Sequence, residues 1–116
     1  MKIPKKIKVG GLEYKVLQGY AFKETELMGQ VSHSQTEIRL NNIDPYGVQY
    51  PNQKKEECFV HEIIHAIDSV YNNNSLEEKT VDRLSQGLYQ VLKDNKLYFG
   101  GLNGKDRDKS SRKTRK

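Results

Sequence analysis

Apolar and polar residues alternate along the first part of the chain, as they do in half-buried β-strands. Residues 6–9 and 12–18 alternate around Gly10-Gly11, which predicts a β-hairpin with a two-residue turn. Residues 29–34 and 36–41 form a second strand-like pair, and we expect Ile38 and Leu40 to face the core. The next residues, 41–53, contain two prolines and are predicted to be a loop that leads into a helix.

From about Gln53 to Tyr71, apolar residues recur every three or four positions, which indicates a helix. The apolar arc of this helix holds Phe59, Val60, Ile63, Ile64, Ala66, Ile67, Val70 and Tyr71, and the narrower polar arc holds Cys58, His61, Glu62, His65, Asp68 and Ser69. A helix that is apolar over more than half of its circumference is buried in its domain. The polar arc is therefore predicted to line a cleft.

A second helix is predicted from about Leu76 to Asp94, after a turn at residues 72–75. Ser75 is the expected N-cap, and Glu78 three residues later completes a capping-box spacing. The apolar stripe expected to face the core consists of Val81, Leu84, Leu88, Val91 and Leu92. The short link makes the two helices antiparallel neighbours.

Strands followed by helices predict an α+β fold, with a small antiparallel or mixed sheet packed on two main helices. The length of 116 residues suits one domain, which we assign to residues 1–104. No apolar run is long enough for a membrane span, the first residues lack the apolar stretch of a signal peptide, and one Cys permits no internal disulfide. These three observations predict a cytoplasmic protein without a membrane partner.

The net charge of +5 belongs to the end of the chain. Residues 105–116 contain seven Lys or Arg and two Asp, which leaves 13 basic and 13 acidic residues in the preceding part. A segment without apolar residues is expected to be disordered. Nucleic acid is therefore a predicted partner only through this tail, whose alternative role is that of a solubilising end.

The polar arc of the first helix contains His61-Glu62-Ile63-Ile64-His65, an H-E-x-x-H pattern. Two His four residues apart lie one turn above each other and can bind one metal ion. Zn²⁺ is the expected ion, because imidazole ligands and tetrahedral geometry suit it. Glu62 can reach a water on the metal without being a ligand, which is the position of a general base.

Catalytic zinc takes three protein ligands, so a third must come from elsewhere. Glu78 is the leading candidate, because the start of the second helix should lie near the end of the first. Glu77 and Cys58 are the alternatives, with Cys58 otherwise acting as a small buried residue. Asp82, one turn after Glu78, can accept a hydrogen bond from the free ring N–H of a ligand His.

Three further residues have weaker claims to a place at the site. His33 lies in a polar strand-like stretch and is either a surface residue or a substrate contact. Tyr46 and Tyr50 belong to the loop before the first helix, where they either cover the edge of the core or polarise a substrate carbonyl.

His61-Glu62-x-x-His65 followed by Glu78-x-x-x-Asp82 resembles the motifs of the gluzincin metallopeptidases. The spacing of thirteen residues from His65 to Glu78 is similar to that of compact bacterial and phage members such as the ImmA/IrrE-type peptidases. The resemblance implies a minimal zincin-like catalytic domain that hydrolyses peptide bonds with zinc, and a protein or peptide as the substrate.

The resemblance extends to the run Leu84-Ser85-Gln86-Gly87-Leu88-Tyr89, which is similar to small phage-encoded proteins of this kind. By analogy with zincin folds, residues 36–41 either receive a peptide by β-addition or form an ordinary strand of the sheet. The chain is thus predicted to be a zinc metallopeptidase, with a non-catalytic, zinc-stabilised regulatory protein as the alternative.

Overall fold

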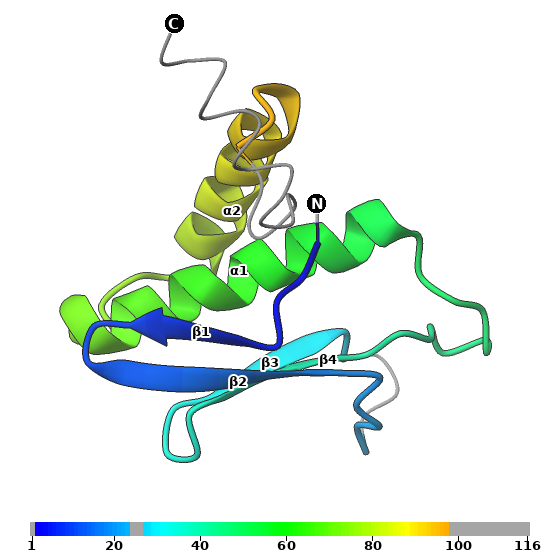
Figure 1. Ribbon diagram of the computed structural model, residues 1–116, viewed down its shortest axis with the longest axis horizontal. Helices are drawn as coiled ribbons and strands as arrows, with labels where there is room; N and C mark the ends of the chain where they lie inside the picture. Colours follow the sequence, from blue (N-terminus) through cyan, green and yellow to red (C-terminus); the bar gives the residue numbers. More distant parts are fainter. Residues whose placement is uncertain (1, 24–26, 98–116) are drawn as a thin grey trace, which may run out of the picture.

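The computed structural model describes residues 2–23 and 27–97, which form four strands and two helices. Figure 1 shows three layers. The long helix α1 (Asn52–Tyr71) lies across one face of the sheet, and α2 (Glu78–Asp94) lies on the side of α1 that is away from the sheet. Among the described residues, α2 packs on α1 and has no contact with the sheet. The predicted α+β class is confirmed, but the sheet packs on α1 alone and not on both helices.

The sheet contains β1 (Lys6–Val9), β2 (Leu12–Gln18), β3 (Gly29–Ser32) and β4 (Glu37–Leu40) in the order β1-β2-β4-β3. The predicted hairpin is confirmed, with Val9 paired to Leu12 across the two-residue turn. The first turn residue, Gly10, has a φ of 61°, a left-handed conformation that glycine adopts without steric cost. Strands β2 and β4 run parallel and the other pairs antiparallel, so the sheet is mixed.

The position of β4 decides between the two alternatives for residues 36–41 and confirms an ordinary strand of the sheet. This strand pairs with β2 on one side and with β3 on the other, so its backbone groups are already used. Its buried residues Ile38 and Leu40 face the core as predicted. The strand at this edge of the sheet is β3, and a peptide can add only there or along β1.

Two apolar clusters explain why α1 is apolar over most of its circumference. Phe59, Ile63 and Ala66 pack on the sheet, and Val60 and Ile64 pack on α2. Figure 1 shows the reason, since α1 lies between the two other layers. The prediction was wrong for the last turns of the helix, where Ile67 and Tyr71 are exposed because neither layer extends over them.

The start of α2 differs from the prediction. The helix begins at Glu78 with Glu77 at the N-cap, and no side chain caps it by a hydrogen bond. Ser75 lies outside the helix and donates its hydroxyl to the Asn72 carbonyl, so the expected capping box does not form. The link is instead held by Asp68, whose carboxylate accepts from the Leu76 N–H at 3.3 Å.

The predicted apolar stripe of α2 was also wrong in part. Val81 and Leu92 pack on α1, but Ser85 and Tyr89, which the stripe did not include, also contact it. The other three members of the predicted stripe, Leu84, Leu88 and Val91, are exposed. The side of α2 that faces α1 is therefore the side that carries Glu78.

The predicted tail at residues 105–116 lies outside the described residues. Neither helix is long and apolar enough to cross a membrane, a finding that covers residues 2–23 and 27–97.

Candidate metal centre

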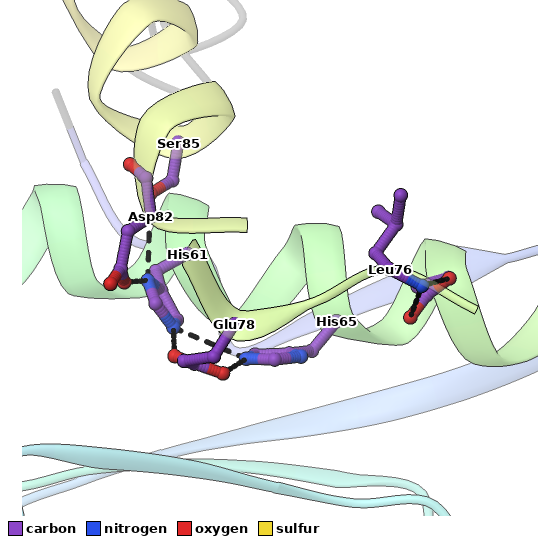
Figure 2. A network of polar contacts seen from close by, with 7 residues as sticks. His61, His65, Leu76, Glu78, Asp82 and Ser85 are labelled. Carbon is purple, nitrogen blue, oxygen red and sulfur yellow. Dashed lines mark hydrogen bonds and ion pairs between the residues drawn. The ribbon is translucent and has the colours of Figure 1, made fainter. Parts of the chain in front are cut away.

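His61 and His65 project from the same face of α1, one helical turn apart, as the H-E-x-x-H spacing requires (Figure 2). Their Nε2 atoms lie 3.2 Å from each other, and the ring centroids are 4.9 Å apart. Both side chains are partly buried, with 19% and 25% of their surface exposed. Two ring nitrogens therefore point at the same small volume.

Glu78 completes this cluster from the first residue of α2. One of its carboxylate oxygens lies 2.8 Å from Nε2 of His61, and the other lies 3.0 Å from Nε2 of His65 (Figure 2). Asp68 contributes indirectly, because its buried carboxylate also accepts from the Asn72 side chain at 2.9 Å and so orders the link between the helices. Asp68 belongs to the predicted polar arc of α1, but the sequence did not indicate this role.

These three residues can hold a metal ion, since one ligand atom from each lies within 4.8 Å of the others. Zinc bonds of about 2.0–2.2 Å place tetrahedral ligand atoms roughly 3.3 Å from one another. The observed separations of 2.8, 3.0 and 3.2 Å are slightly shorter than that. Small side-chain rotations would open the cluster to the size of a metal site.

Asp82 lies on the opposite side of the His61 ring from the cluster. Its carboxylate is 3.1 Å from Nδ1 of His61, and the Ser85 hydroxyl is 3.5 Å from the same atom. When Nδ1–H donates to Asp82, the lone pair of the neutral ring is on Nε2, where a metal needs it. Ser85 was not predicted, although it follows Asp82 by three residues and so shares its face of the helix.

Glu62 is buried, with 6% of its surface exposed, and its carboxyl group lines the same cleft as the cluster. Burial and, to a lesser extent, the negative charge of Glu78 raise the pKa of Glu62 to about 8. A bound cation would favour the ionised form of this carboxyl group. The residue predicted as the general base thus has a pKa suited to proton transfer near neutral pH.

Gly29 of β3 makes room for Glu62. A Cβ atom at this position would lie 3.1 Å from a Glu62 carboxylate oxygen and would overlap the Sγ atom of Cys58. Burial, followed by the charges of Glu62 and Glu57, raises the pKa of Cys58 to about 12. A protonated thiol is a poor zinc ligand, and Cys58 lies outside the His–His–Glu group. A glycine in a strand can mark a close approach of another part of the chain, but the sequence alone does not identify Glu62 or Cys58 as the neighbour.

The other candidates do not belong to the His–His–Glu group. Glu77 is exposed at the N-cap of α2 and is not part of the group that can hold a metal. Tyr46 is 89% exposed and therefore does not cover the edge of the core. Neither Tyr46 nor Tyr50 lines the cleft. His33 is exposed, and its pKa is lowered by partial desolvation and then by the charge of His65.

The cleft has a volume of about 530 Å³ and lies between α1 and the edge strand. Its strand wall is formed by residues 27–31, and its helix wall by Lys54, Glu57, Cys58, His61, Glu62 and His65, with Glu78 at one end. The His–His–Glu group therefore opens into a groove. The wall at residues 27–31 is mainly apolar, and the wall formed by α1 carries charged side chains.

Searches with this chain against protein-family models, curated proteins and solved structures each found no match. The assignment of these residues as a candidate metal site therefore depends on their geometry alone.

Proposed function

We propose that the chain is a zinc-dependent metallopeptidase with a minimal zincin-like domain of the gluzincin type. The observation that carries the proposal is the convergence of His61, His65 and Glu78 beside the buried carboxyl group of Glu62. Two His and one Glu leave one coordination position open, as catalytic zinc requires. A structural zinc site would instead be closed by a fourth side chain.

A zinc ion held by these residues would supply Lewis-acid polarisation of a carbonyl and would acidify a water molecule. Glu62 would act as the general base that takes a proton from an attacking water, and as the general acid that returns it to the leaving amine. Asp82 holds the His61 ring in the tautomer that binds the metal. Gly29 leaves the space in which the Glu62 side chain lies.

An extended substrate can lie along β3, which forms one wall of the cleft. Among the described residues, this strand is paired only with β4, so its other edge can hydrogen-bond a peptide backbone. Leu27, Met28 and Val31 give that wall an apolar surface for side chains of the peptide. A protein or peptide substrate therefore fits the groove better than a small polar molecule does.

The test combines zinc content with cleavage of a peptide library, measured on the wild type and three carboxyl-to-amide variants. Glu62→Gln should keep about one zinc per chain and lose cleavage by at least about 100-fold, because the general base is removed. Glu78→Gln should lose both zinc and cleavage. Glu77→Gln, the adjacent control that lies outside the cluster, should keep both.

Three outcomes would contradict the proposal. A wild type that takes up no zinc after reconstitution removes the metal site altogether. Equal effects of Glu77→Gln and Glu78→Gln remove the ligand assignment. Cleavage or biological activity that survives Glu62→Gln, with zinc still bound, leaves a zinc-stabilised protein whose action is not hydrolysis.

A further inference from the structure

The cleft extends along α1 from the His–His–Glu group towards the start of the helix. Glu57 lines it one turn before His61, and Lys54 lines it two turns before His61. These two are the charged side chains of the helix wall that belong neither to the His–His–Glu group nor to the proposed general base. They are therefore the groups of α1 that can meet a charged part of a substrate.

Lys54 carries a charge that the described part of the chain leaves unpaired. It lies three residues before Glu57, a spacing that allows an ion pair on a helix. The two side chains do not form one, and no other carboxylate within residues 2–23 and 27–97 forms an ion pair with Lys54. Its exposed side chain at the cleft is available to a ligand.

The strand wall of the cleft sets the direction of a bound peptide. A Cβ atom at Gly29, where β3 begins, would overlap Cys58 of α1. His33, just after the strand, lies farther along the helix, where the charge of His65 reaches it. The strand and α1 therefore run in roughly the same direction, as Figure 1 shows. A peptide that pairs with β3 in the antiparallel sense, which is the more stable one, has its C-terminal part towards Lys54.

The distance along the helix gives the register of this peptide. Seven positions separate Lys54 from His61, which is a rise of about 10 Å. An extended peptide covers that length in about three residues. A carboxylate nearer to the metal site would instead meet Glu57, whose negative charge repels it.

We propose that Lys54 is a specificity-determining residue that binds a carboxylate of the substrate about three residues beyond the cleaved bond, on its C-terminal side. That carboxylate belongs either to an Asp or Glu side chain at this position or to the C-terminus of a short peptide. The proposal rests on the proposed peptidase activity and names the substrate class of the same cleft. Because Lys54 is exposed, we expect a preference of about fivefold in kcat/KM.

The test uses peptides built on the best-cleaved member of the library, with the zinc-loaded full chain. One set carries Glu, Gln or Lys at each of the first four positions after the cleaved bond. The wild type should prefer Glu to Gln about fivefold at or next to the third position, and should cleave the Lys peptide least well. A second set ends at the third position with a free or an amidated C-terminus. A preference for the free acid assigns the carboxylate to the C-terminus, and a preference confined to the first set assigns it to a side chain.

Two charge reversals at neighbouring lysines locate the effect. Lys54→Glu should reverse the preference, so that the Lys peptide is cleaved better than the Glu peptide. Each enzyme is compared on its own set of peptides, so a general loss of activity does not change the ratio. Lys55→Glu makes the same change of charge one residue away, where the side chain does not line the cleft, and should keep the wild-type preference.

Equal kcat/KM for the acid and amide forms in both peptide sets overturns this proposal and leaves the peptidase assignment standing. A preference that Lys54→Glu leaves unchanged, or that Lys55→Glu reverses equally, does the same. If the zinc-loaded chain cleaves no peptide of any charge, the peptidase activity and this proposal fall together.

Discussion

Glu62 should make the metal-free protein less stable as the pH rises. Its pKa is raised from an ordinary value of 4.5 to about 8 by burial and by the charge of Glu78. The folded protein therefore keeps this proton over a pH range in which the unfolded chain has lost it. The contribution of Glu62 to the free energy of unfolding should be highest below about pH 4.5 and fall until about pH 8, above which both states are ionised.

The size of the effect follows from the shift. A difference of about 3.5 pKa units corresponds to about 5 kcal/mol across the whole range, or about 1.4 kcal/mol for each pH unit within it. Glu62→Gln keeps the shape of the side chain and removes its titration. The variant should therefore be more stable than the wild type near pH 8, and the advantage should shrink towards pH 5.

Urea denaturation in the presence of a chelator, repeated at each pH unit from about 5 to about 8, measures both proteins. The difference between them isolates Glu62, because every other titrating group is common to the two. Parallel stability curves for the wild type and Glu62→Gln would refute the reasoning, since they would show that this carboxyl group titrates alike in the folded and unfolded chains.

Zinc should reverse this trend in the wild type. A cation beside the carboxyl group favours its ionised form, so the folded protein no longer holds the extra proton. The stabilisation conferred by a fixed excess of zinc should then increase with pH.

Two other substitutions test the packing around the site. Gly29→Ala should destabilise the fold by about 1–3 kcal/mol, because the added Cβ overlaps Cys58. Gly11→Ala is the control, because a Cβ there meets no atom within 4 Å, and it should have little effect in the same urea titration. Equal effects of the two substitutions would contradict the close contact at Gly29. Tyr89→Phe should cost about 2 kcal/mol by removing a buried hydrogen bond of 2.6 Å to Glu56, and an unchanged unfolding midpoint would show that this bond contributes nothing.

The parts of the fold that the sequence predicts are those set by short-range physics. Alternation around Gly10-Gly11 specifies the hairpin, because a two-residue turn leaves the next strand only one partner. The position of β4 depends instead on a parallel pairing with β2 across residues 19–36, and no local pattern records it. The sequence therefore left open whether residues 36–41 form an edge strand or an ordinary strand of the sheet.

The His–His–Glu group could be anticipated because helix periodicity and one short link set its positions. The H-E-x-x-H spacing places His61 and His65 on one face, and a link of six residues, 72–77, returns Glu78 to them. Gly29 could not be anticipated in the same way. Its contact with Glu62 joins residues 33 positions apart and appears only when the strand lies against the helix.

The orientation of α2 shows two requirements of the sequence in conflict. The apolar stripe predicts that the side with Leu84, Leu88 and Val91 packs on α1. Glu78 and Asp82 lie on a different side of α2, about 100° around the helix, and they reach His61 only if that side faces α1. The structure adopts the second orientation, with Ser85 and Tyr89 in the contact.

This orientation leaves three apolar side chains in water, which costs free energy that a rotated helix would recover. Rotation would separate Glu78 from both histidines. Departures from the local rules are expected at functional sites, and here the departure is explained by the carboxylates that the rotation would displace.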